Sequence, residues 1–139
     1  MKVIFLDIDG VLNKAMSPSK AKEEDDLIEG KKYGWMNKSL VNNLNKIIAQ
    51  TGAKIVLSSS WRYQDTVKNQ AMLSDFGIEC DVVGQTKRLD GVHIKRGNEI
   101  FLWIYENKDL TGCQYYNFKQ YIIIDDDSDM LLWQAEHFI

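Results

Sequence analysis

Three short apolar runs, each followed immediately by polar residues, constrain the fold of this chain more than any other feature. The runs cover residues 3–6, 54–57 and 121–124, and each has the length of a buried strand. Segments with helical periodicity separate them, and alternating strands and helices predict an open parallel α/β sheet with helices on both faces. Because ligands bind beyond the carboxyl ends of such strands, the polar residues that follow the runs are candidate site residues.

Asp7 and Asp9 follow the first run, and Gly10 comes directly after them. Side chains alternate along a strand, so the two carboxylates project the same way while Ile8 turns back into the core. Two carboxylates aimed at one point repel unless a cation lies between them, and Mg²⁺ is the usual cation for oxygen ligands. The alternative interpretation is an ordinary surface turn, since Asp and Gly are common turn residues.

The other two runs also end in polar clusters. Ser-Ser-Ser-Trp-Arg occupies residues 58–62, and Asp-Asp-Asp-Ser-Asp occupies residues 125–129. Between these clusters, Lys95 and Arg96 open a predicted amphipathic helix that runs to about residue 107. The inner face of this helix is expected to consist of Ile100, Trp103 and Ile104. All of these clusters can therefore converge on one crevice at the edge of the sheet.

This ordered set of motifs resembles the haloacid dehalogenase (HAD) superfamily of phosphotransferases. The matching positions, from the first motif to the fourth, are Asp7-Ile8-Asp9-Gly10, Ser58, Lys95 or Arg96, and Asp125 with Asp126. Residues 55–62 and 124–130 further look like the HAD domains of RNA-repair proteins, and they are similar to the 3′-phosphatase domain of phage polynucleotide kinase-phosphatases. The resemblance implies a HAD-like Rossmannoid fold.

The resemblance also implies a reaction, the Mg²⁺-dependent hydrolysis of a phosphomonoester through an aspartyl-phosphate. Asp7 would be the nucleophile, and Asp9 would be the general acid for the leaving oxygen and then the general base for water. Ser58 would bind a phosphoryl oxygen. The metal would be bound by Asp7, the Asp9 backbone carbonyl and Asp126, with Asp125 behind Asp126 orienting a water on the metal.

One cation at the start of the helix would neutralise charge on the phosphoryl group, and two residues are candidates. The repair-associated group has an Arg-Gly-x-x-Ile pattern at this place, which favours Arg96. The wider superfamily more often uses Lys, which would favour Lys95. We expect Arg96 to be catalytic and Lys95 to bind substrate.

Ser59, Trp61 and Arg62 are expected at the rim of the site as substrate contacts. A base could stack on Trp61 while Arg62 pairs with a phosphate. The competing interpretation is that Trp61 is a packing residue at the start of a helix. Asp127 and Asp129 are expected to interact with a helix dipole rather than to bind metal.

The expected partner is a phosphorylated substrate. An open site suits a nucleic-acid 3′-phosphate end better than a small metabolite. A phosphatase for nucleotides or other small metabolites is the alternative, with the segment after the first strand folding over as a lid. An alternative of another class is a non-enzymatic phosphoacceptor or binding module on the same fold. A carboxylate two residues after the nucleophile speaks for hydrolysis, and the acidic pair lies on the last strand, unlike that of bacterial receiver domains.

A chain of 139 residues predicts one HAD-like domain over residues 1–139, with a flap at about residues 14–36 and no large cap. No apolar run has the length of a membrane span, the two cysteines lack metal-ligand spacing, and no cleavable signal pattern opens the chain. We therefore expect a cytoplasmic protein without membrane contact or an obligate protein partner. The net charge of −3 argues mildly against a broad nucleic-acid surface.

Local signals predict the remaining elements. Asn37 is a plausible N-cap for a helix closed by Gly52, and Asp65 is a plausible N-cap for the next helix. A short strand is expected over residues 80–83 and a last helix over about residues 130–136. The residues expected to face inward from the two capped helices are Leu40, Leu44, Ile47, Ile48, Val67, Ala71, Met72 and Phe76.

Overall fold

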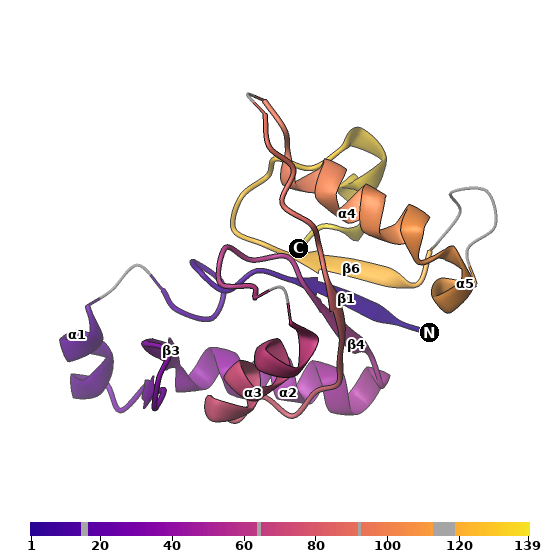
Figure 1. The fold of residues 1–139 in the computed structure, drawn as a ribbon. Coiled ribbons are helices and arrows are strands. Elements are labelled where there is room, and N and C mark those ends of the chain that lie inside the picture. Colours follow the sequence, from indigo (N-terminus) through magenta and orange to yellow (C-terminus); the bar gives the residue numbers. More distant parts are fainter. Residues whose placement is uncertain (15–16, 64, 92, 113–118) are drawn as a thin grey trace.

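A four-stranded parallel sheet forms the centre of the computed structural model, which describes residues 1–14, 17–63, 65–91, 93–112 and 119–139 (Figure 1). Its order is β5-β4-β1-β6, and every neighbouring pair is parallel. The strands are β1 (Val3–Leu6), β4 (Lys54–Leu57), β5 (Val82–Gln85) and β6 (Tyr121–Ile124). The predicted parallel α/β fold is confirmed.

The central strands carry continuous apolar runs because both faces of the sheet are buried. In β1, Ile4 and Leu6 belong to the larger core cluster on one face, while Val3 and Phe5 belong to the smaller cluster on the other. The Phe5 ring meets the Trp103 ring edge to face, with centroids 5.4 Å apart. The helix that follows β5 therefore packs against the face of the sheet that carries the smaller cluster.

Helices cover both faces of the sheet, as predicted (Figure 1). The helices are α2 (Lys38–Thr51) and α3 (Thr66–Asp75) on one face, and α4 (Arg96–Glu106) with the 3-10 helix η1 (Leu132–His137) on the other; α5 (Lys108–Thr111) follows α4. The predicted inner face of α4 is confirmed, since Ile100, Trp103 and Ile104 are buried. Burying each such side chain is worth about 1.5–3 kcal/mol, so this packing fixes how α4 is rotated.

The segment predicted to be a flap contains α1 (Pro18–Glu23) and an antiparallel hairpin of β2 (Leu27–Glu29) and β3 (Trp35–Asn37). The Lys31 backbone N–H donates to the Asp75 carboxylate at 2.6 Å, and the Tyr33 ring lies edge-on to Tyr63. These contacts attach the hairpin to α3 and the loop before it. The described part of the chain has no large cap, which agrees with the prediction.

The start of α2 is capped by a different residue from the one predicted. Asn37 occupies the N-cap position, but its side chain makes no capping hydrogen bond. Its amide oxygen accepts from the Lys14 N–H at 2.8 Å, and its amide nitrogen donates to Asp26 at 2.9 Å. Asp26 replaces it as the cap by accepting the Ser39 N–H at 2.6 Å, and this hydrogen bond lowers the pKa of the Asp26 carboxyl. A residue remote in sequence therefore caps the helix.

The prediction of an inward-facing side chain is wrong for three residues, because Ile47, Val67 and Ala71 are exposed. In α3 a polar residue takes the inward position instead. Asn69 is fully buried and bonds the backbone of Tyr63 in both directions, accepting its N–H at 2.7 Å and donating to its carbonyl at 3.0 Å. A buried polar side chain of this kind shifts the inner face away from the purely apolar pattern.

The other local predictions hold with small shifts. Asp65 caps α3 by accepting the Val67 N–H at 2.8 Å, and Gly52 closes α2 with a φ of 67°. The strand expected over residues 80–83 starts two residues later, and the last helix is a 3-10 helix that starts at Leu132. Among the residues that the structure describes, no helix combines the length and hydrophobicity needed to cross a bilayer.

Candidate active site

The register of the sheet brings the residues after three strands to one level. The last residue of β1 pairs with the last residues of both β4 and β6. The residues that come next, Asp7, Ser58 and Asp125, therefore leave the carboxyl edge of the sheet side by side. This is the place at which an open α/β sheet binds its ligands.

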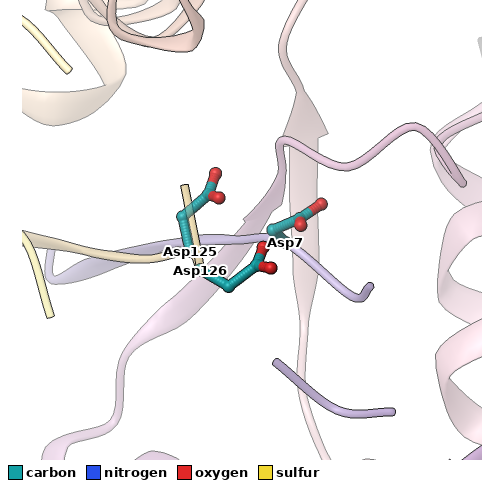
Figure 2. Close-up of side chains that lie close together, drawn as sticks. All are labelled: Asp7, Asp125 and Asp126. Atoms are coloured by element: carbon teal, nitrogen blue, oxygen red, sulfur yellow. The ribbon is translucent and has the colours of Figure 1, made fainter. Parts of the chain in front are cut away.

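Asp7, Asp125 and Asp126 form an acidic cluster at this edge (Figure 2). One carboxylate oxygen from each lies within 4.8 Å of the others, with Asp7 and Asp125 buried and Asp126 exposed. Burial raises the pKa of the Asp7 carboxyl, although a hydrogen bond from Ser59 opposes this. Burial likewise raises the pKa of Asp125 to about 6, and the charges of Asp7 and Asp126 add to that shift. Like charges held this close favour a cation between them.

The donor set fits Mg²⁺, which prefers hard carboxylate oxygens. Oδ2 of Asp125 is buried and has no hydrogen-bond partner within the described part of the chain. The Arg96 Nε lies 3.8 Å from it, too far for a hydrogen bond. Asp7, Asp125 and Asp126 are therefore the side chains that could hold the metal. The carboxylate of Asp9 is outside this cluster. This agrees with the predicted metal ligands, which include only the backbone carbonyl of Asp9.

Gly10 makes the close approach of the first and fourth motifs possible. Its φ is +77°, in the left-handed region that favours glycine. A Cβ at this position would lie 2.1 Å from Oδ2 of Asp126, far inside van der Waals contact. Glycine is thus required here both for the turn and for the space that the Asp126 carboxylate occupies.

Arg96, the first residue of α4, directs its guanidinium toward the acidic cluster. Its Nη1 donates to the Ser58 backbone carbonyl, and its side chain lines the cleft above the cluster. Lys95 is the exposed N-cap residue of α4 and is not among the described residues that line this cleft. Of the two candidate cations, Arg96 is the one that the fold brings to the acidic cluster.

Arg62 does not reach the cleft. Its side chain is only 5% exposed, and its Nη2 lies 2.9 Å from a Glu99 carboxylate oxygen while its Nη1 donates to the Ser59 carbonyl at 2.6 Å. The expectation that Arg62 pairs with a substrate phosphate does not fit this burial. Glu99 was not predicted, although it also lies 3.8 Å from Arg96 Nη1. The sequence signal that could have identified Glu99 is its i,i+3 spacing from Arg96 on the predicted helix.

The three consecutive serines have different environments. Ser58 Oγ is fully buried and has no hydrogen-bond partner among the described residues, so no neighbour there engages the hydroxyl predicted to bind a phosphoryl oxygen. Ser59 is also buried and hydrogen-bonds Asp7, so it supports the predicted nucleophile. Ser60 is the serine that lines the cleft, and it was not predicted.

Asp9 and Trp61 are joined by a hydrogen bond. The indole Nε1–H donates to Asp9 Oδ2 at 2.9 Å, and the Asn13 amide donates to Oδ1 at 2.9 Å. Trp61 also packs against the larger core cluster, with its ring centroid 6.4 Å from that of Phe76. Of the two interpretations of Trp61, this arrangement favours packing over base stacking. Asn13 lines the cleft and carried no recognisable pattern in the sequence.

The acidic residues after the fourth motif also differ from one another. Oδ2 of Asp129 accepts the Arg96 N–H at 2.8 Å, and its carbonyl accepts the Gly97 N–H at 3.3 Å. Asp129 therefore meets the positive end of α4, as the dipole argument predicts, although the helix concerned is not the one that follows it in sequence. Asp127 lines the cleft, and its N–H donates to Asp125 Oδ1 at 2.9 Å.

An open cleft of about 520 Å³ lies over the acidic cluster. Besides the motif residues, Lys14 and Trp35 line it, and Trp35 comes from β3 of the hairpin. Neither was predicted, because a lone lysine and a lone tryptophan in a polar segment form no pattern. They give the cleft one more cation and an aromatic surface beside the acidic cluster.

The comparisons with known proteins agree with this geometry. Residues 3–139 match the family described as "HAD domain in Swiss Army Knife RNA repair proteins". The predicted resemblance is thereby confirmed, and the match spans every site residue discussed above. No curated protein and no solved structure matches the chain.

Proposed function

We propose that this chain, which belongs to the haloacid dehalogenase family as a HAD domain of the RNA-repair type, is a Mg²⁺-dependent phosphomonoesterase that acts through an aspartyl-phosphate. The family itself indicates a phosphatase-type function in general. The finer proposal is supported by the acidic cluster of Asp7, Asp125 and Asp126, which shares one cleft with Arg96 and Asp9. A nucleophile, a cation and a second carboxylate are the groups that phosphoryl transfer requires.

In the first step, a carboxylate oxygen of Asp7 attacks the phosphorus atom and the bond from phosphorus to the leaving oxygen breaks. Protonated Asp9 gives its proton to that oxygen, so an alcohol departs and Asp9 becomes a carboxylate. Arg96 stabilises the negative charge that the phosphoryl oxygens carry in the transition state. Its guanidinium is held for this by a hydrogen bond to the Ser58 backbone carbonyl.

In the second step, the Asp9 carboxylate takes a proton from water while the water oxygen attacks phosphorus. The bond between phosphorus and Asp7 breaks, which yields inorganic phosphate and the free Asp7 carboxylate. Asp9 is protonated again, so the protein returns to its starting state.

Bound Mg²⁺ would supply positive charge that screens the repulsion between the Asp7 carboxylate and the phosphate. Asp7, Asp125 and Asp126 would hold it. Asp125 is well suited, because the oxygen that it offers is buried and has no hydrogen-bond partner in the described part of the chain.

We propose a nucleic-acid 3′-phosphate end as the substrate. The cleft is open, and the described segment that follows β1 forms a small helix and a hairpin rather than a large cap. Trp35 offers a ring on which a base can stack, and Lys14 offers a cation for a neighbouring phosphate. The family description, which refers to RNA repair proteins, supports the same choice. Nucleotides or other small metabolites are the alternative substrates.

The test is phosphate release with Mg²⁺ and with EDTA from four substrate classes, namely 3′-phosphorylated oligonucleotides, 5′-phosphorylated oligonucleotides, mononucleotides and sugar phosphates. We expect the 3′-phosphorylated oligonucleotide to be the best substrate and EDTA to abolish its turnover. Asp7→Asn should abolish turnover without changing the circular dichroism spectrum. Asp109→Asn, an exposed residue of α5, serves as the matched control and should behave as wild type.

Three results would contradict parts of this proposal. A folded Asp7→Asn variant with near wild-type turnover would rule out the covalent mechanism. A long-lived phosphorylated Asp7 in the wild-type protein would favour a phosphoacceptor over a hydrolase. A clear preference for mononucleotides or sugar phosphates would replace the proposed substrate with the small-metabolite alternative.

A further inference from the structure

The carboxylate of Asp9 is held from both sides by N–H donors. Trp61 Nε1 lies 2.9 Å from Oδ2, and Asn13 Nδ2 lies 2.9 Å from Oδ1. The amide of Asn13 is itself oriented, because its oxygen accepts the Gly10 N–H at 3.1 Å. Each carboxylate oxygen keeps a second lone pair that can carry a proton. The two donors therefore fix the plane of the carboxyl group without blocking proton transfer.

Trp61 is held firmly enough to act as such a fixed donor. Its ring packs on Phe76 and against the larger core cluster. Its backbone N–H donates to Ser59 Oγ at 3.2 Å. Ring packing against the residue that ends α3 and the hydrogen bond within its own turn thus determine where the indole N–H points.

The same turn supports both carboxylates of the first motif. Ser59 hydrogen-bonds Asp7, while Trp61 hydrogen-bonds Asp9. Residues 59–61 follow β4, the neighbour of β1 in the sheet, so the turn adjoins the first motif directly. A tryptophan that served packing alone could place its N–H toward solvent. This one directs the N–H to the predicted general acid.

We propose that Trp61 is a positioning residue, whose indole N–H holds Asp9 in the orientation from which it protonates the leaving oxygen. This inference rests on the proposed function, because it takes Asp9 as the general acid of the first step. The phosphorus–oxygen bond breaks as the Asp9 proton moves to the leaving oxygen, so a rotated carboxyl group would deliver that proton poorly.

A misdirected general acid matters most when the leaving oxygen is strongly basic. An acidic phenol such as p-nitrophenol departs with little help from a proton, whereas a weakly acidic phenol depends on it. Phe at position 61 keeps an aromatic ring against Phe76 but removes the N–H. We expect Trp61→Phe to lower kcat/KM about tenfold for the least acidic phenol and less than about twofold for p-nitrophenol, within the ~10²–10⁴-fold that general acid–base catalysis contributes.

The experiment measures kcat/KM for a series of substituted phenyl phosphates that differ in the acidity of the leaving phenol. Wild type, Trp61→Phe and Asp9→Asn are compared, with Trp133→Phe as the matched control because Trp133 is an exposed residue of η1 outside the cleft. Asn13→Ala removes the other donor and leaves the indole packing in place. The Gly10 N–H retains a partner in that variant, since it also donates to the Asn13 backbone carbonyl at 3.0 Å.

The dependence on leaving-group acidity should be steeper in Trp61→Phe than in wild type, approach that of Asp9→Asn, and be unchanged in Trp133→Phe. An equal loss across the series, or no loss, overturns the inference and leaves Trp61 a packing residue. If Trp61→Phe does not fold, β-(3-benzothienyl)alanine at position 61, which keeps the bicyclic ring but lacks the N–H, decides in the same way, and Asn13→Ala reports only on the second donor. A wild type without phosphatase activity overturns the proposed function itself, whereas an active wild type with an unchanged Trp61→Phe dependence overturns only this inference.

Discussion

Asp126→Asn and Asp129→Asn should change the stability of the metal-free protein in opposite directions, and only Asp126→Asn should abolish stabilisation by Mg²⁺. The two residues lie three positions apart, and each substitution removes one negative charge. Their surroundings differ, because Asp126 belongs to the acidic cluster whereas Asp129 caps α4. The pair therefore tests whether the fourth motif is assigned to the correct residues.

The size of the stability change expected for Asp126→Asn follows from charge repulsion. Two unit charges 4.8 Å apart repel by about 1 kcal/mol in a water-like medium. Asp126 faces two such neighbours, Asp7 and Asp125, and it is exposed, so screening reduces the sum. We expect Asp126→Asn to stabilise the metal-free protein by about 1 kcal/mol, which raises Tm by roughly 3 °C for a chain of this length.

The stability change expected for Asp129→Asn has the opposite sign. Its carboxylate accepts the first N–H of α4 and places a negative charge at the positive end of the helix. Such a charge is worth about 0.3–1 kcal/mol, and asparagine keeps the hydrogen bond but not the charge. Asp129→Asn should therefore lower Tm by roughly 2 °C with or without Mg²⁺.

Mg²⁺ separates the two variants further. A ligand at 100 times its dissociation constant that binds only the folded state stabilises it by about 2.7 kcal/mol. That gain corresponds to roughly 9 °C in Tm here. Wild type and Asp129→Asn should show it, and Asp126→Asn should not. Thermal melts over a Mg²⁺ titration, after dialysis against EDTA, measure all of these shifts.

If Asp129→Asn lost the Mg²⁺ effect while Asp126→Asn kept it, the fourth motif would be assigned three residues too early. If Asp126→Asn destabilised the metal-free protein, the repulsion inferred for the acidic cluster would be absent. Either result would refute the reasoning from the cluster geometry.

Two further predictions concern α4 and α2. Arg96→Ala should lower kcat about 100-fold because the transition state loses a stabilising charge, whereas Lys95→Ala should change mainly KM. Steady-state kinetics of the two variants test this. If the two effects were exchanged, Lys95 and not Arg96 would be the catalytic cation. Asp26→Ala should cost about 1 kcal/mol at pH 7, since Asp26 caps α2. Because the pKa of Asp26 is lowered by folding, its contribution is present above the ordinary value of 3.8 and disappears as pH falls through the folded-state pKa. Urea titrations from pH 7 down to pH 3 should show the difference from wild type shrinking, and a constant difference would contradict this assignment.

The parts of the site that could be predicted from the sequence are those set by local patterns. Apolar runs mark the strands, and the polar residues after them must leave the same edge of a parallel sheet. Asp7, Ser58 and Asp125 come together for this reason alone, since the three strands are in register. The direction of Arg96 was also predictable, because the buried face of α4 fixes the rotation of that helix.

The parts that could not be predicted depend on contacts between residues far apart in the sequence. Arg62 looked like a phosphate ligand because it follows the serines, but its partner Glu99 lies 37 residues later. Asn37 looked like a helix cap, but its amide oxygen accepts the N–H of Lys14, 23 residues earlier, instead of an N–H of α2. Trp61 and Asp9 are 52 residues apart. Which polar groups pair is decided by the folded arrangement, and periodicity carries no information about it.

The charges around the cleft connect the fold to the proposed metal requirement. Within the described residues, five carboxylates line the cleft, from Asp7, Asp9 and residues 125–127, against two cations, Lys14 and Arg96. With all five carboxylates ionised, the excess of three negative charges equals the formal net charge of the whole chain, so the remaining residues are neutral in sum.

A phosphate monoester brings further negative charge into a cleft that already repels it. Arg62 cannot offset this, because its charge is neutralised by Glu99 outside the cleft. A divalent cation at the acidic cluster is the remaining way to make the cleft attractive to a phosphate. The acidic net charge of the chain therefore supports a metal-dependent phosphate site, and it does not argue against a nucleic-acid end as the substrate, because the residues outside the cleft are neutral in sum.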